Sequence, residues 1–190
     1  HKLNIGIVGA AGYTGGELIR ILCNHPNIDQ IIAQSESQKG KKISSIHTDL
    51  VGDIESEFQD KLDVREVDVV FLCKGHGQSQ TYLAAHTDLY SIKIIDLSQD
   101  FRMSGSHEFV YGLPEMSRKW IRKAKYIANP GCFATAIQLG LLPAMAASAV
   151  HGDVHVSGLT GSTGAGQAKT ATSHYSWRND NASVYKAFVH

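Results

Sequence analysis

Residues 2–23 read KLNIGIVGAAGYTGGELIRILC, and this stretch decides the fold class. A short apolar run from Lys2 to Val8 enters Gly9. Residues 15–23 then repeat apolar side chains at the i, i+3 and i+4 spacing of an amphipathic helix. The order strand, glycine turn, helix predicts the first unit of a doubly wound parallel sheet, in which ligands bind at the carboxyl edge of the strands.

The same alternation continues through the first two thirds of the chain. Mostly apolar runs at residues 29–33, 67–73 and 91–97 predict three further strands. Residues 79–86 predict a helix between the last two of them. Strands that alternate with helices form parallel sheets. We therefore expect an α/β fold with a Rossmann-type dinucleotide-binding domain over residues 1–128.

The pattern changes near Asn129. Residues 132–147 predict one long helix, and residues 153–159 (DVHVSGL) alternate as a half-buried strand would. These features predict that residues 129–190 begin a second, α+β catalytic domain. The chain has no polar tail after its last apolar run, so we expect it to be a fragment in which this domain is incomplete.

Composition excludes several classes of protein. Lys and Arg number 18 and Asp and Glu number 18, so no net field favours nucleic acid or an anionic membrane surface. No apolar stretch approaches the roughly 20 residues that span a bilayer. The three cysteines form no CxxC pair, which argues against a disulfide framework and a zinc site. We expect a soluble cytoplasmic protein without a metal, whose partner is a small molecule.

The glycine turn is a candidate dinucleotide site. Gly9, Gly12 and Gly15 have GxxGxxG spacing, a variant of the dinucleotide fingerprint, and Tyr13 and Thr14 lie between the last two glycines. Glycines also serve ordinary tight turns. The position at the first strand of a parallel sheet, with a helix N-terminus facing the turn, favours binding of a pyrophosphate.

The end of the second predicted strand should select the cofactor ribose. Glu36 in this loop is an argument for NAD. The loop also carries two hydroxyls and three lysines: Ser35, Ser37, Lys39, Lys41 and Lys42. This set resembles a cradle for a 2′-phosphate more than a solvated charged loop, so we predict NADP.

Cys132 is the candidate nucleophile. It lies in IANPGCFAT, after a Pro-Gly turn and in the first turn of the long predicted helix, where the helix dipole stabilises a thiolate. Cys23 and Cys73 fall inside apolar patterns and are most simply core residues. Residue types alone do not choose the proton-transfer partner among the ten histidines, although His76 and His190 are candidates.

Two further features suit ligand binding. Arg102 follows the fourth predicted strand and is the best-placed cation for an anionic substrate, although an isolated Arg is more often a surface residue. Residues 161–166 (GSTGAG) form a second glycine- and hydroxyl-rich loop, in which Ser162, Gly164 and Gly166 are suited to approach a phosphate or a nicotinamide. The same loop on its own is also compatible with a flexible turn.

The order of five motifs carries a family resemblance. The segments GAAGYTGGEL, IDLSQDFR, YGLPE, NPGCFAT and GSTGAG follow one another as in the N-acetyl-γ-glutamyl-phosphate reductase family of the aspartate-semialdehyde dehydrogenase superfamily. The resemblance runs from Leu3 to His190, and NPGCFAT is its most specific part. It implies an NADPH-dependent enzyme of arginine biosynthesis that forms homo-oligomers through its second, catalytic and dimerisation domain.

The resemblance also implies a mechanism. Cys132 attacks the γ-acyl phosphate and leaves a thioester, and hydride from NADPH gives a thiohemiacetal that collapses to the semialdehyde. His190 matches the first histidine of a pair that precedes Pro-Glu in the family, which implies a general acid/base role. Arg102 and Asn129 are implied at the substrate, and residues 162–166 at the cofactor.

The sequence departs from the family pattern in three places and leaves alternatives open. The second histidine and the Pro-Glu that follow the first histidine in the family are missing, because the given sequence ends at His190. The stretch between DFR and YGLPE is shorter than in many members, and Lys74 and Gly75 stand where a more apolar, proline-containing version is common. An aspartate-semialdehyde dehydrogenase and an aminoadipyl-phosphate reductase would share the thiolate, NADP and acyl phosphate chemistry. An NADP-sensing protein without catalysis is the alternative outside enzymes.

Overall fold

The computed structural model describes residues 2–185 and residue 187. The chain forms two compact units, residues 1–158 and residues 159–190. These units are defined by their internal contacts. The domain boundary that the sequence predicts between residues 128 and 129 is not tested by this division and stays a prediction.

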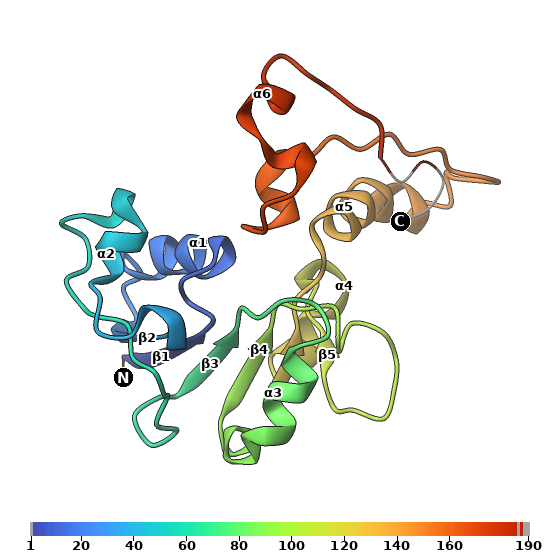
Figure 1. Ribbon diagram of the computed structural model, residues 1–190. Helices are drawn as coiled ribbons and strands as arrows, with labels where there is room; N and C mark the ends of the chain where they lie inside the picture. Colours follow the sequence, from blue (N-terminus) through green and yellow to red (C-terminus); the bar gives the residue numbers. More distant parts are fainter. Residues whose placement is uncertain (1, 186, 188–190) are drawn as a thin grey trace. The chain divides into compact units, whose positions relative to one another are not determined.

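The first unit contains a six-stranded sheet in the order β2-β1-β3-β4-β6-β5, in which every neighbouring pair is parallel (Figure 1). The strands are β1 (Leu3–Val8), β2 (Ile28–Gln34), β3 (Val69–Leu72), β4 (Lys93–Asp96), β5 (Val110–Tyr111) and β6 (Tyr126–Ala128). The sheet confirms the Rossmann-type prediction.

The chain changes direction across the sheet after β2. It runs from β1 to β2 on one side and then crosses to β3 on the other side of β1. In register, Ile7 pairs with Ala33 of β2 and with Phe71 of β3. The carboxyl ends of β1 and β3 therefore form the switch point where ligands bind in open parallel sheets.

Helices lie between most of the strands, and a further helix follows the last strand. They are α1 (Tyr13–Leu22), α2 (Ile43–Ile46), α3 (Ser79–Ala85), α4 (Pro114–Ile121) and α5 (Cys132–Ala146), with 3₁₀ turns η1 (Glu36–Gln38), η2 (Thr48–Leu50) and η3 (Thr87–Ser91). Four strands and three helices lie close to the predicted segments. No pattern in the sequence predicted the two-residue β5, α2 or α4.

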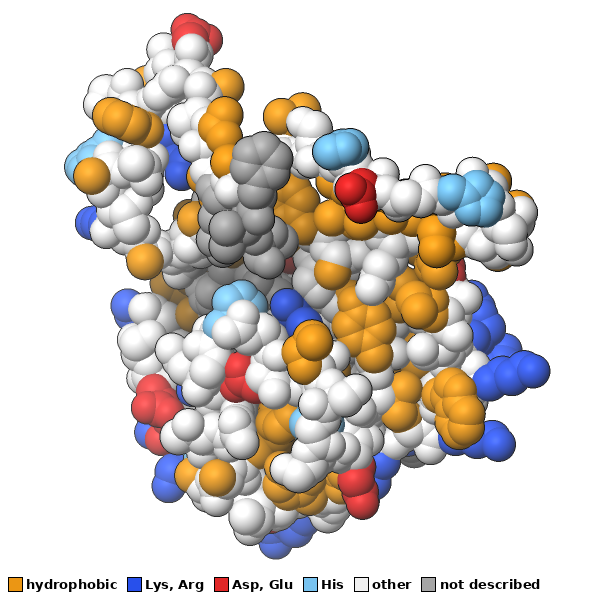
Figure 2. All heavy atoms as spheres, turned by 90° about the vertical axis from the view of Figure 1, so that its right-hand side faces the viewer, with side chains coloured by type: hydrophobic (Ala, Val, Ile, Leu, Met, Phe, Trp, Pro, Cys, Tyr) orange, Lys and Arg blue, Asp and Glu red, His pale blue; other side chains and the backbone are white. Residues whose placement is uncertain are grey.

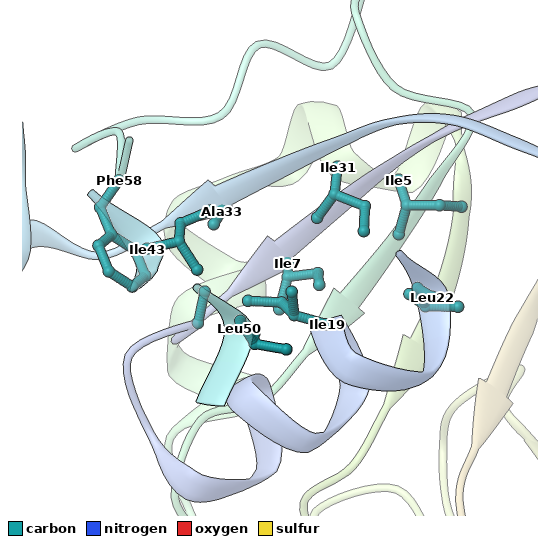
Figure 3. Close-up of a cluster of buried hydrophobic side chains, with 10 residues drawn as sticks. Ile5, Ile7, Ile19, Leu22, Ile31, Ala33, Ile43, Leu50 and Phe58 are labelled. Atoms are coloured by element: carbon teal, nitrogen blue, oxygen red, sulfur yellow. The ribbon is translucent and has the colours of Figure 1, made fainter. Parts of the chain in front are cut away.

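Two apolar cores lie on the two faces of the sheet. Ile5 and Ile7 of β1 pack in a cluster with Ile19 of α1, which Figure 3 draws, whereas Val8 belongs to a second cluster with Leu83 of α3. Successive side chains of a strand point to opposite faces, so this division follows from the alternation in LNIGIV. Both faces are covered, as an all-parallel sheet requires.

The predicted strand at residues 153–159 is wrong. The structure assigns no strand there, and all seven residues are exposed. A strand needs a neighbour that accepts its backbone hydrogen bonds, and alternation in the sequence does not supply one.

Helix α5 is apolar along its length, yet none of its residues is buried. Leu139 and Met145 of this helix are 40% and 55% exposed. Figure 2 shows one face of the molecule, on which hydrophobic side chains are exposed at the surface beside acidic and basic ones. The apolar surface of α5 is therefore only partly covered by the residues that the structure describes.

The second unit contains η4 (Ser162–Ala165), η5 (Ala171–Ser173) and α6 (Tyr175–Arg178), and its described residues are exposed. Across the described part of the chain, no helix is both long and apolar enough to cross a membrane.

Candidate active site

The glycine turn after β1 has a geometry that larger residues would not allow. Gly9 has a φ of +79°, and a Cβ at this position would lie 2.7 Å from the carbonyl oxygen of Cys73, which follows β3. A Cβ at Gly15 would lie 2.6 Å from the Ala10 Cα. The first and third glycines therefore let β1, β3 and α1 approach one another at the switch point.

The N-terminus of α1 is open toward a ligand. Its N-cap residue Gly12 has extended backbone angles and provides no side-chain cap. The N–H groups of Gly9 and Ala10 donate to the Gln34 carbonyl, at 3.1 and 3.0 Å. Within the described residues no protein acceptor takes the N–H of Tyr13 or Thr14. The first turn of α1 therefore presents unpaired donors and a positive dipole end to an anion.

The loop after β2 holds hydroxyls and lysines, but the lysines have protein partners. Ser35 is buried, and its Oγ lies 3.5 Å from the Oγ of Ser37. Lys39 Nζ donates to Asp60 Oδ2 at 2.7 Å. Lys42 is paired with a carboxylate and Lys41 donates to Gln38. A phosphate in this loop would meet the two serines first and would compete with Asp60 for Lys39.

Cys132 is the first residue of α5. Its N-cap residue, Gly131, has extended backbone angles and no capping side chain, and the thiol is exposed. This is the position that the sequence predicts, with the sulfur at the positive end of a 15-residue helix. Burial, and more weakly the charge of Asp96, raises the pKa of the Cys73 thiol to about 12, so Cys73 is not a competing nucleophile.

A pocket of about 570 Å³ joins the glycine turn to the cysteine. Thr14 of α1 and Cys132 of α5 both line it, and so does Arg102. Two uncapped helix N-termini and one guanidinium therefore surround the same space. This arrangement suits a ligand with anionic groups beside a thiol nucleophile.

Arg102 is held in the pocket by backbone carbonyls. Its Nε donates to the Asn129 oxygen at 2.9 Å, and its Nη2 donates to the Leu97 oxygen at 2.8 Å. Its Nη1 would lie 3.0 Å from a Cβ at Gly131. Glycine before the cysteine therefore makes room for the guanidinium, a role that no local sequence pattern reveals.

Asn129 supports the turn that precedes Cys132. Its N–H donates to the Asp96 carbonyl at 2.8 Å, and its Nδ2 donates to the Pro130 carbonyl at 3.1 Å. Thr135, which the sequence did not single out, also lines the pocket, and its Oγ1 donates to Gly131 at 2.9 Å. The carboxyl end of β4 therefore fixes the position from which α5 starts.

A hydrogen-bonded network orders the loop that carries Arg102. Ser98 donates to Asp96 at 2.7 Å and accepts from the Asp100 N–H at 3.0 Å. The Asp100 carboxylate accepts from Gly77 and Gln80 before and within α3, at 2.6 and 3.0 Å. The role of Asp100 was missed in the sequence because Gly77 and Gln80 lie 23 and 20 residues away from it.

Other predicted site residues are not among those that line this pocket, or they fall outside the described residues. His76 Nδ1 accepts from the Gln99 N–H at 3.1 Å, and Tyr13 is 49% exposed at the start of α1. Ser162, Gly164 and Gly166 lie in the second unit, in and directly after η4. His190 lies outside the described residues. No group of three or more metal-ligating side chains occurs in residues 2–185 and 187.

Family models match nearly the whole chain. Residues 4–124 match the model "Semialdehyde dehydrogenase, NAD binding domain". Residues 132–190 match the model "Semialdehyde dehydrogenase, dimerisation domain".

Curated relatives carry a more specific name. An N-acetyl-gamma-glutamyl-phosphate reductase from Azobacteroides pseudotrichonymphae is 53% identical over 189 residues, which are 99% of this chain and 59% of the relative. A reductase of the same name from Parabacteroides distasonis is 49% identical, with the same coverage of 99% and 59%. The chain therefore spans about three fifths of the length of these relatives.

Solved structures share the fold. An aspartate semialdehyde dehydrogenase II from Vibrio cholerae has a TM-score of 0.59 at 21% identity, over 77% of this chain and 47% of that one. An aspartate semialdehyde dehydrogenase with NADP from Candida albicans has a TM-score of 0.58 at 16% identity, over 79% of this chain and 48% of that one.

Proposed function

Because the chain belongs to the semialdehyde dehydrogenase family, we propose that the full-length protein reduces N-acetyl-γ-glutamyl phosphate to N-acetylglutamate 5-semialdehyde. The reaction uses NADPH, releases phosphate and serves arginine biosynthesis in the cytoplasm. The observation that carries the proposal is the shared pocket of Thr14, from the glycine turn, and Cys132, at the start of α5. The acyl group is taken from the relatives named as this reductase.

The residues present fit a dinucleotide. Because Gly9 and Gly15 have no Cβ, the backbone at Cys73 and at Ala10 comes closer to the turn than a side chain would allow. The first turn of α1 has N–H donors for a pyrophosphate. We assign Gly12, Tyr13 and Thr14 to the same site. The bound NADPH supplies hydride.

We propose NADP over NAD for the loop after β2. Ser35 and Ser37 offer adjacent hydroxyls, and Lys39 offers a cation that Asp60 holds nearby. By the family resemblance, Ser162, Gly164 and Gly166 are proposed as further cofactor contacts.

In the proposed first step, the Cys132 Sγ forms a bond to the γ-carbonyl carbon, the bond from that carbon to the phosphate oxygen breaks, and phosphate leaves. The backbone N–H groups at the start of α5 stabilise the oxyanion that develops. Arg102 binds an anionic group of the substrate with the N–H groups that Asn129 and Leu97 leave free.

After hydride reaches the thioester carbon, the thiohemiacetal hydroxyl loses its proton, the carbon–sulfur bond breaks and the thiol is restored. We propose His190 as the acid and base of these transfers, by its match to the family histidine. We also propose a homo-oligomer, which agrees with the dimerisation-domain match and with the exposed Leu139 and Met145 of α5.

The test compares NADPH oxidation by the full-length protein on N-acetylglutamyl, aspartyl and aminoadipyl phosphates. We expect the highest kcat/KM for the first, and a preference for either of the others would overturn the substrate assignment. Cys132→Ser should abolish turnover and acyl transfer to the protein, which intact mass measures. Turnover in this variant would overturn the thioester mechanism and, if NADPH still binds, would leave the dinucleotide site standing.

A further inference from the structure

His47 is a buried polar residue that the proposed chemistry does not use. It lies between α2 and η2 and is 8% exposed. Its Nε2 lies 2.8 Å from the Ala10 carbonyl oxygen, in the glycine turn 37 residues earlier. A carbonyl only accepts, so the ring donates this hydrogen bond. An imidazole from the β2–β3 crossover therefore contacts the backbone of the candidate dinucleotide turn.

The imidazole is fixed on several sides. A Cβ at Gly16 would collide with its Nδ1, so the ring lies against the bare backbone of α1. On another side the ring meets Phe58 edge-on, with centroids 6.2 Å apart. The backbone N–H of His47 donates to Ile43 at 2.9 Å, and its carbonyl accepts from Leu50 at 3.0 Å. Figure 3 shows Ile43, Leu50 and Phe58 gathered at one end of the buried cluster that lies against α1.

The contact fixes one peptide plane of the turn. The Ala10 N–H donates to the Gln34 carbonyl at 3.0 Å, and the Ala10 carbonyl accepts from His47. In a trans peptide the N–H points opposite to the carbonyl of the same plane. The bond from His47 therefore turns the Ala11 N–H away from the imidazole. Two separate segments of the chain, the end of β2 and the α2–η2 turn, thus set the backbone orientation between Gly9 and Gly12.

We propose that His47 is a positioning residue for the dinucleotide site, which holds the glycine turn in the conformation that receives the pyrophosphate. The inference rests on the proposed use of this turn for NADPH. An apolar side chain would fill the same space in the cluster, but it would leave the Ala10 carbonyl without a donor. The turn would then adopt other peptide orientations before the cofactor binds, and binding would have to reverse them.

Two substitutions at His47 separate the hydrogen bond from the packing. His47→Leu removes the donor, whereas in His47→Gln the side-chain amide reaches about as far as Nε2 and donates to the same carbonyl. In the full-length protein we expect His47→Leu to raise the Kd of NADPH about tenfold, the size of one lost hydrogen bond. Its KM for NADPH should rise while kcat at saturating NADPH stays within about twofold. His47→Gln should recover most of the affinity.

The matched control is Phe58→Leu, which reduces packing against the same ring but removes no donor. We expect this variant to lower Tm and to leave the NADPH Kd unchanged. Equal Kd values for wild type and His47→Leu would overturn the positioning role, and so would equal losses of affinity in His47→Leu and Phe58→Leu. If His47→Leu does not fold, His47→Asn, whose amide stops short of Ala10, replaces it. Equal NADPH affinity of the Asn and Gln variants would then refute the inference.

The wild-type titration separates this inference from the proposed function. If the wild-type protein binds neither NADPH nor NADH in a fluorescence titration, the dinucleotide site and the role of His47 both fail. If it binds NADPH and His47→Leu binds equally well, only the role of His47 fails.

Discussion

The glycines of the turn should have separable roles in stability and in cofactor binding. Gly15→Ala places a methyl group 2.6 Å from both the Cα and the carbonyl oxygen of Ala10. Carbon atoms in contact lie about 3.5–4.0 Å apart, so α1 must move away from the turn by about 1 Å. Gly12→Ala meets its nearest neighbour, the Gly9 oxygen, at 3.6 Å, which is an ordinary contact.

These distances give different expected costs. The overlap at Gly15 costs about 1–3 kcal/mol, and about 0.5–1 kcal/mol is recovered because alanine favours the helix over glycine. We therefore expect Gly15→Ala to lower the free energy of unfolding by about 0.5–2 kcal/mol. Gly12→Ala should change it by less than about 1 kcal/mol, because alanine is only a somewhat poorer N-cap residue than glycine. A methyl group at Gly12 nevertheless blocks the approach of the pyrophosphate to the backbone.

The assay is thermal and urea unfolding without cofactor, together with a fluorescence titration of NADPH. Gly15→Ala should lose stability, whereas Gly12→Ala should keep stability and bind NADPH at least tenfold more weakly. If Gly15→Ala is as stable as the wild-type protein, the close packing of α1 on the turn is refuted. Wild-type NADPH affinity of Gly12→Ala would refute the placement of the cofactor.

Three further outcomes are expected. Iodoacetamide at pH 8 should label Cys132 and spare Cys73, whose pKa is raised to about 12 by burial; equal labelling rates by mass spectrometry would contradict this assignment. Arg102→Lys should raise the KM for the acyl phosphate about tenfold or more, because an ammonium does not bind two carbonyls and a substrate anion in one plane; steady-state kinetics with an unchanged KM would contradict it. The pKa of Asp63 is lowered to about 2, first by the side-chain hydrogen bond from Arg65, so its contribution to stability is present above about pH 4 and is lost as the pH falls toward 2. Asp63→Asn should flatten urea-unfolding stability over that window, and an unchanged slope would count against the pair.

Much of the fold can be read from local patterns. The run LNIGIV, the glycine turn and the amphipathic helix after it agree with β1 and α1 because period-2 and period-3.6 patterns report directly on which face is buried. Residues 153–159 show where this reasoning stops. Their alternation is suitable for a strand, but a strand also requires a neighbour, which no local pattern contains.

The candidate site also has one part that the sequence predicted and one part that it did not. The start of α5 at Cys132 was predictable, because the Pro-Gly turn and the helical pattern lie within a few residues of the cysteine. The three lysines of the loop after β2 were predicted as a phosphate cradle, but Lys39 is paired with Asp60, 21 residues away. Which side chain neutralises a lysine depends on how distant segments pack.

The sequence by itself determined the parallel α/β sheet, the glycine turn at its first strand and the thiol at a helix start, since each depends on residues that are near in sequence. Only the tertiary structure decided that Thr14 and Cys132 line one pocket. It also decided that Arg102 binds the Asn129 carbonyl and that His47 binds the Ala10 carbonyl, across 27 and 37 residues. The physical reason is that every residue carries a backbone carbonyl, so a hydrogen bond to that carbonyl does not depend on which side chain the accepting residue has and leaves no local pattern in the sequence.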